Sequence, residues 1–181
     1  LSVWQWPEAM FNLFSQFYNA NPESILYLLI PSYDHAKVRE YIKKYRIPKE
    51  SYLLEEIAHD DVGKVIGISD AGLLLRETHP VNLVSSPTKF GEYLAAGVPV
   101  IITEGIGDYS SMAEEMKVGI TLSFDDASLR EEEKKRLLSF SKDVMENREI
   151  WASRCKRAAQ EQLEWAVYAE KLAEQYVKLE V

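Results

Sequence analysis

Short apolar runs alternate with amphipathic stretches along the first two thirds of this chain. Apolar runs bounded by turn residues are typical of buried strands, and apolar residues spaced three and four apart are typical of helices. Their alternation predicts βαβ units and therefore a doubly wound, Rossmann-like parallel sheet. We expect strands over 25–30, 51–58, 71–75, 98–103 and 118–122, and helices over 7–18, 34–45, 60–68, 87–96 and from Asp108 onward.

The remaining third of the chain is expected to be wholly helical. Ser128 and Glu131 have the spacing of a capping box, which predicts a helix start there, and two more helices are expected over 148–160 and 162–179. The last helix carries an apolar stripe, for which we expect contact with the core, the alternative being contact with a partner. This stripe consists of Trp165, Ala169, Leu172 and Tyr176.

The segment SSPTKFGEYLAAGVPVI, residues 85–101, has the clearest local signals. Ser86 is expected to be the N-cap of a helix, Pro87 its first residue, and Gly97 the residue just past its end. The apolar run 98–102 follows directly and predicts a buried parallel strand. One short helix therefore leads into a central strand.

Lys89 and Glu92 lie three residues apart on the same face of this expected helix. The start of a helix has unpaired N–H groups and a partial positive charge, and a lysine there adds a full charge, so the site suits a diphosphate. A carboxylate one turn deeper can accept hydrogen bonds from vicinal sugar hydroxyls, which together with phosphate indicates a nucleotide. The alternative is a surface ion pair worth a few tenths of a kcal/mol.

These residues closely resemble the donor-site signature of retaining glycosyltransferases with the GT-B fold, the large family 4 group. The resemblance covers about residues 1–125, including 69–76 and Trp4-Gln5-Trp6, whereas the C-terminal helices match only in kind. The agreeing signature positions are Pro87, Lys89, Glu92, Tyr93, Leu94, Ala95, Gly97, Pro99, Val100 and Ile101.

The resemblance implies the C-terminal, donor-binding half of a GT-B enzyme, with the core over about 1–125 and extra helices over about 128–181. The N-terminal acceptor domain is expected to be absent from this chain. The implied reaction moves a sugar from a nucleotide diphosphate donor to an acceptor hydroxyl, in polysaccharide or glycoconjugate biosynthesis. The fragment alone is expected to bind donor and to transfer little or none.

The resemblance also implies roles for individual residues. Lys89, Arg76 and the amides near Thr88 are expected to stabilise the diphosphate leaving group without a metal ion or cofactor, while Glu92 anchors ribose. The loop at 57–59 and Val62 beyond it are expected to hold the nucleobase. The expected donor-binding residues are Glu92, Thr88, Ser86, Pro87, Phe90, Ile57, His59 and Val62.

One departure from the family concerns the transferred sugar. Many members carry two glutamates separated by seven residues, and the first of them faces that sugar. Here its position is occupied by Val84, and Glu77 is the nearest carboxylate, at the wrong spacing. This departure leaves the sugar open but does not affect the expected nucleotide site.

Arg76 ends the strand that precedes the signature helix. Ligands bind at the carboxyl edge of such sheets, so Arg76 is expected to be a second cation for the diphosphate, the alternative being a pair with Glu77. The loop 77–83 is expected to shape the sugar pocket, with His79 as a minor candidate for ligand contact. Gly105 and Gly107 hint at a close backbone approach.

Composition limits the other possibilities. The 181 residues are 46% apolar and 28% charged, which suits one soluble domain, and no apolar run approaches the ~20 residues of a membrane span. The net charge of −8 argues against a broad nucleic-acid or anionic-membrane surface. The single cysteine, Cys155, suits a reducing cytoplasm and is expected to be an inert surface thiol; membrane association is expected only through the missing half.

No other catalytic motif stands out. His59-Asp60-Asp61 alone does not make a metal site, and Ser110 occupies the third glycine position of a dinucleotide fingerprint. Two further classes remain open: a nucleotide-sugar epimerase of GT-B-like architecture, and a non-catalytic Rossmann-like module whose signature helix is only structural.

Overall fold

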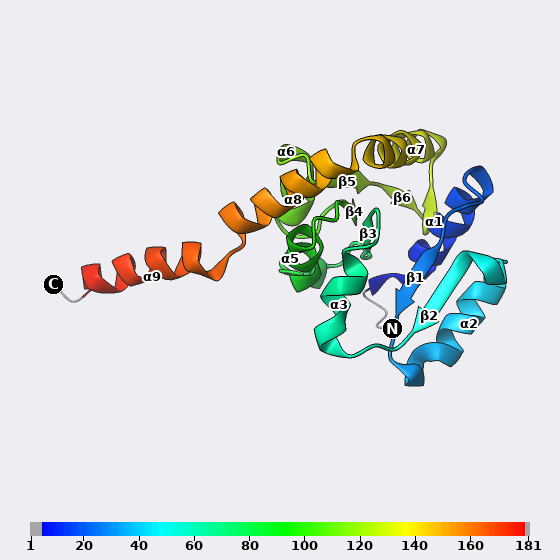
Figure 1. Cartoon of the computed structure of the whole chain (residues 1–181), viewed down its shortest axis with the longest axis horizontal. Helices are drawn as coiled ribbons and strands as arrows, with labels where there is room; N and C mark the ends of the chain where they lie inside the picture. Colours follow the sequence, from blue (N-terminus) through cyan, green and yellow to red (C-terminus); the bar gives the residue numbers. More distant parts are fainter. Residues whose placement is uncertain (1–4, 180–181) are drawn as a thin grey trace.

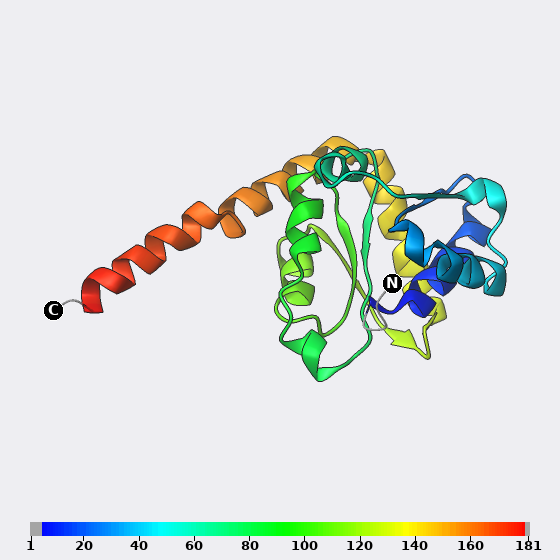
Figure 2. The same cartoon turned by 90° about the horizontal axis from the view of Figure 1, so that it is seen from below.

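A computed structural model describes residues 5–179 as an α/β body from which one long helix extends (Figures 1 and 2). Helices precede or follow each parallel strand, as the alternation of patterns predicts. The helices are α1 Pro7–Ala20, α2 His35–Lys44, α3 His59–Ile66, α4 Pro80–Leu83, α5 Thr88–Ala95, α6 Tyr109–Glu115, α7 Glu131–Glu146, α8 Arg148–Gln162 and α9 Trp165–Leu179. Short 3₁₀ turns occupy Ser32–Asp34 and Lys49–Ser51.

A three-stranded parallel sheet forms the centre of the body. Its order is β3 (Gly72–Leu74), β4 (Val100–Thr103), β5 (Gly119–Leu122). Every residue of β4 is buried, because helices cover both faces of the sheet. The predicted buried central strand after the signature helix is therefore confirmed.

The two faces of β4 enter different parts of the core. Val100 and Ile102 pack with α5, α6 and α8, whereas Ile101 packs with residues of α1 and α7. This division follows from the alternation of side chains along a strand. Figure 2 shows α5 and α6 along one side of the sheet.

The remaining two parallel strands, β1 (Leu26–Leu29) and β2 (Tyr52–Glu55), form a separate ladder. The expected α/β class is confirmed, but the sheet is divided rather than continuous. Leu73 of β3 packs against the core clusters on both sides of this division, so side-chain contacts join the two parts. Helices α1 and α2 cover the β1–β2 pair through a shared apolar cluster.

The segment after β5 differs from the expected helix start. It forms a hairpin of β6 (Phe124–Asp125) and β7 (Ser128–Leu129), whose two turn residues both have positive φ, as in a type I′ turn. Helix α7 begins only after Arg130, and no side chain caps it. The capping-box prediction is wrong because the Ser128 hydroxyl instead accepts a hydrogen bond from Asn12 Nδ2 at 2.9 Å.

Helix α9 extends away from the body (Figure 1). Leu172 is 49% exposed and Tyr176 is 68% exposed, so the predicted core contact is wrong for these residues. The side chain of Trp165 lies outside the described part of the chain. An apolar stripe shows that a helix face favours burial, but it does not show which surface covers it.

Cys155 also differs from the expectation of a surface thiol. It is fully buried between α8 and the sheet, and its Sγ lies 3.9 Å from the Val118 carbonyl oxygen. Burial raises the pKa of its thiol to about 12. The neighbouring Arg154 acts in the opposite direction, but desolvation is the larger effect.

Candidate functional site

The expected site lies where strands end and helices begin. The chain leaves β3 and β4 at the same edge of the parallel sheet, and α4, α5 and α6 start from the connections at that edge (Figure 2). In open α/β sheets this carboxyl edge is where ligands bind. The signature helix and Arg76 are therefore brought to one edge by the topology.

Helix α5 begins one residue later than the sequence predicts. Pro87 is its N-cap, because the Pro87 carbonyl accepts the Phe90 N–H at 3.0 Å. Ser86 is thus not the cap, and its hydroxyl lies 2.6 Å from the Tyr109 hydroxyl. The helix end is as predicted, since Gly97 follows it with φ of 82°, a conformation that favours glycine.

Lys89 and Glu92 form an ion pair on the surface of α5. The Nζ to Oε2 distance is 3.0 Å, and the side chains are 51% and 40% exposed. Thr88, at the helix start, is exposed as well, whereas Phe90 is fully buried with its ring edge against Tyr109. Phe90 therefore positions the helix from within and offers no side-chain surface to a ligand.

Arg76 carries a charge that no carboxylate balances among the described residues. Its backbone is fixed to the end of β4, since its N–H donates to Thr103 Oγ1 at 2.9 Å and its carbonyl accepts from the same hydroxyl at 3.0 Å. Among the described residues, the guanidinium donates only to Asn82 Oδ1, at 3.3 Å, and its buried Nε has no partner. Desolvation lowers the pKa of Arg76. The alternative pairing with Glu77 is not formed.

The loop 77–83 contains one helical turn, α4, and a buried amide. Asn82 is 1% exposed, and its Nδ2 donates to the Glu77 carbonyl at 2.7 Å. His79 caps this turn, because its Nδ1 accepts the Val81 N–H at 3.2 Å. The sequence analysis missed Asn82 and Thr103 as supports of Arg76. A polar residue ending an apolar strand was the available signal for Thr103.

The predicted close backbone approach is confirmed at Gly107, whereas the nearest neighbour of Gly105 is the side chain of Leu83. Both have positive φ, and a Cβ at Gly107 would lie 2.7 Å from the Ser85 carbonyl oxygen. Ser110 then anchors the start of α6, because its hydroxyl accepts the Ile106 N–H and donates to the Thr103 carbonyl, both at 2.9 Å. The segment before α5 is thus packed directly against this glycine turn.

The residues expected near the nucleobase lie at the start of α3. Ile57 and Val62 are half-buried, and His59 is exposed at the first position of the helix. Asp61 pairs with Lys64 at 2.7 Å. Among the side chains that the structure describes, no three His, Cys, Asp or Glu residues are grouped as metal ligands would be. Across residues 5–179, no helix is both long and apolar enough to cross a membrane.

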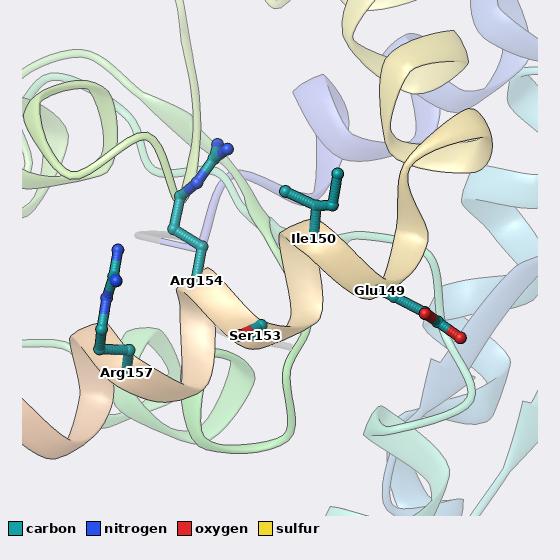
Figure 3. A pocket seen from close by; sticks show the side chains of 5 residues that line it. All are labelled: Glu149, Ile150, Ser153, Arg154 and Arg157. Carbon is teal, nitrogen blue, oxygen red and sulfur yellow. The ribbon is translucent and has the colours of Figure 1, made fainter.

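Two recesses lie away from Lys89 and Glu92, and the sequence indicated neither. The larger, about 360 Å³, lies along α8, where Arg154 and Arg157 point to one side (Figure 3). Arg154 is already engaged, since it donates to the Lys117 carbonyl at 2.9 Å and stacks over Trp151. The smaller, about 150 Å³, lies between α1, α2 and the residue after Arg76. It is lined by Trp6, Pro7, Glu8, Lys37, Tyr41 and Glu77.

Comparison with known proteins shows the fold. No family model matches the chain. No curated protein matches it either. Among solved structures, WaaG, a glycosyltransferase involved in lipopolysaccharide biosynthesis, aligns with 93% of this chain at a TM-score of 0.65 and 11% identity. The pneumococcal O-GlcNAc transferase GtfA, solved with UDP and GlcNAc, aligns with 98% at 0.65 and 11% identity. AviGT4, a glycosyltransferase involved in Avilamycin A biosynthesis, aligns with 96% at 0.61 and 19% identity.

The chain spans 42%, 33% and 48% of the lengths of WaaG, GtfA and AviGT4. The fold is therefore that of one Rossmann-like half of a GT-B glycosyltransferase, which confirms the fold that the sequence resemblance implies.

Proposed function

We propose that this chain is the donor-binding part of a glycosyltransferase that moves a sugar from a nucleotide diphosphate to an acceptor hydroxyl. The observation that carries the proposal is the position of α5: it starts at the carboxyl edge of the sheet with Lys89 and Glu92 exposed on its first turns. The fold shared with three glycosyltransferases supports it, as does the UDP bound to GtfA. WaaG's role in lipopolysaccharide synthesis supports a place in polysaccharide or glycoconjugate biosynthesis.

The position of Lys89 is poorly explained by helix stability. A cation in the first turn opposes the helix dipole, at a cost of about 0.3–1 kcal/mol. The exposed ion pair of Lys89 with Glu92 stabilises the helix by about 0.2–1 kcal/mol, so the two effects nearly cancel. A charged hydrogen bond to phosphate is stronger, about 1.5–3 kcal/mol, so a diphosphate can draw Lys89 from Glu92. Glu92 is then released to accept hydrogen bonds from ribose hydroxyls.

Arg76 complements Lys89 from the neighbouring strand end. Its partly buried guanidinium has no carboxylate partner among the described residues, and an unpaired, desolvated charge is costly. An anionic ligand at this edge offsets that cost. In the proposed reaction, Lys89, Arg76 and the Thr88 amide stabilise the charge that develops on the leaving diphosphate. This role requires no metal ion.

The proposal is tested by calorimetric titration of the chain with UDP, GDP, and the nucleosides uridine and guanosine. We expect one diphosphate to bind and to bind more tightly than its nucleoside. Failure of both diphosphates to bind would favour the non-catalytic module. Interconversion of sugar epimers by the full-length protein, without transfer, would favour the epimerase.

We further propose that transfer requires the part of the enzyme that this chain does not include. Positioning of two reactants supplies about 7–11 kcal/mol of the barrier reduction, and the chain spans at most 48% of the aligned enzymes. The chain is therefore expected to bind donor without transferring sugar. A transfer assay with mixed acceptors, run on the chain and on the full-length protein, tests this expectation. We place the reaction in the cytoplasm, where nucleotide sugars are the donors.

A further inference from the structure

We propose that Asn82 is a positioning residue: its side-chain amide fixes the guanidinium of Arg76 without neutralising the charge that Arg76 offers to an anion. This inference rests on the proposed function, in which Arg76 meets the diphosphate. Asn82 is only 1% exposed, so its side chain offers no surface to a ligand. Its influence on binding therefore has to pass through Arg76, to which it is hydrogen-bonded.

The amide of Asn82 forms one hydrogen bond on each side. Its Nδ2 donates to the Glu77 carbonyl at 2.7 Å, and its Oδ1 accepts from Arg76 Nη1 at 3.3 Å. A carbonyl needs a donor and a guanidinium needs an acceptor, which fixes the orientation of the amide. An amide supplies both from one neutral group, whereas an ionised aspartate can only accept. This position therefore suits asparagine and not aspartate, although the two side chains have the same shape.

The segment around Asn82 has its polar and apolar side chains reversed. The amide is buried, whereas Val81 is 61%, Leu83 49% and Val84 85% exposed. Burial of apolar surface drives folding, so a buried polar group beside exposed apolar ones is the informative exception. The inward position of Asn82 is therefore explained by its two polar partners and not by apolar burial.

The charge of Arg76 is held in place but not balanced. Thr103 fixes its main chain, and the buried Nε of its guanidinium has no partner among the described residues. Desolvation lowers the pKa of Arg76, and no described carboxylate opposes this effect. A carboxylate in place of Asn82 would pair with the guanidinium and cancel the charge that attracts an anion. The neutral amide orients the guanidinium and leaves that charge available.

The orientation of Arg76 before binding also affects affinity. A long side chain loses rotamer freedom when a ligand fixes it, and a side chain that is already oriented loses less. Asn82 holds the end of the Arg76 side chain, while Thr103 holds its backbone. Together they reduce the entropy that Arg76 loses when a diphosphate binds.

The test compares affinities for UDP and uridine, or for GDP and guanosine if the chain prefers guanine, by calorimetric titration at two ionic strengths. The wild type should prefer the diphosphate. Asn82→Ala, which removes the acceptor, should reduce this preference about fivefold. Asn82→Asp, which adds a carboxylate, should reduce it about tenfold and weaken its salt dependence, as Arg76→Ala does. Nucleoside affinity should not change in either variant.

A double-mutant cycle separates the positioning of Arg76 from a purely structural role of the loop. In a chain that already carries Arg76→Ala, Asn82→Ala should not reduce the preference further, because no guanidinium remains to be positioned. A reduction of equal size in both backgrounds would overturn the inference. An equal loss of diphosphate and nucleoside affinity in the Asn82 variants would overturn it as well.

Asn12→Asp is the matched control. Like Asn82, Asn12 donates to a loop carbonyl, that of Ala127, and accepts from a side chain, that of Gln16, both at 2.9 Å. Thermal unfolding of the same samples should show a lower Tm for this control, with an unchanged preference for the diphosphate. If neither Asn82 variant folds, the amide is required for the fold and the inference is overturned. Absence of diphosphate binding by the wild type would instead overturn the proposed function.

Discussion

Replacing Glu92 with glutamine separates the two interpretations of the Lys89–Glu92 pair. The pair joins atoms 3.0 Å apart, but its side chains are 51% and 40% exposed. Exposed pairs contribute about 0.2–1 kcal/mol to the free energy of unfolding. For a chain of this size that corresponds to a fall in Tm of at most about 4 °C. Stability should therefore change little.

Nucleotide affinity should change much more. If Glu92 accepts hydrogen bonds from ribose, loss of its charge removes an interaction worth about 1.5–3 kcal/mol. This corresponds to a roughly tenfold to 150-fold weaker Kd. The expected result is therefore a large loss of affinity in a protein whose Tm is nearly that of the wild type.

The assay is calorimetric titration with UDP and GDP, combined with thermal unfolding of the same samples. Glu131→Gln is the matched control, since Glu131 forms an i,i+3 pair with Lys134 on α7 at 2.5 Å. This control should show a similarly small fall in Tm and no change in affinity. If Glu92→Gln behaves like the control, the pair is only a surface ion pair and the ribose assignment is refuted.

Three further predictions concern the phosphate cations, the sheet and the buried thiol. Arg76→Ala and Lys89→Ala should weaken diphosphates more than nucleosides, and the loss should shrink as salt rises, as titrations at two ionic strengths would show. Gly119→Ala should destabilise the fold by about 1–3 kcal/mol or more, because its Cβ would collide with a carbonyl of the paired strand β4. Gly63→Ala, with open space around its Cβ, should instead stabilise α3 by about 0.5–1 kcal/mol, and denaturant unfolding would compare the two. Cys155, with its pKa raised to about 12, should resist iodoacetamide at pH 8 until urea unfolds the chain, as mass spectrometry would show.

The site was only partly predictable from the sequence. Some of its features depend on neighbouring residues, whereas others depend on contacts between residues far apart in the chain. The end of α5 at Gly97 depends on neighbouring residues, so the sequence indicated it correctly. The start of α5 was misplaced by one residue, since Ser86 finds a partner in Tyr109, 23 residues away. The Thr103 hydroxyl binds the backbone of Arg76, although the two residues are 27 positions apart in the sequence. No local sequence pattern predicts this contact.

Hydrophobic periodicity and capping signals were sufficient for the α/β alternation, the buried strand β4 and the end of α5. These features depend on interactions within a few residues, which the amino-acid order itself determines. Cys155 and the stripe on α9 show the opposite case. Both lie on helices in the last third of the chain, yet Cys155 is fully buried and Leu172 is 49% exposed. Which face of a helix is covered depends on whether another element lies against it, and that is determined when distant segments pack together.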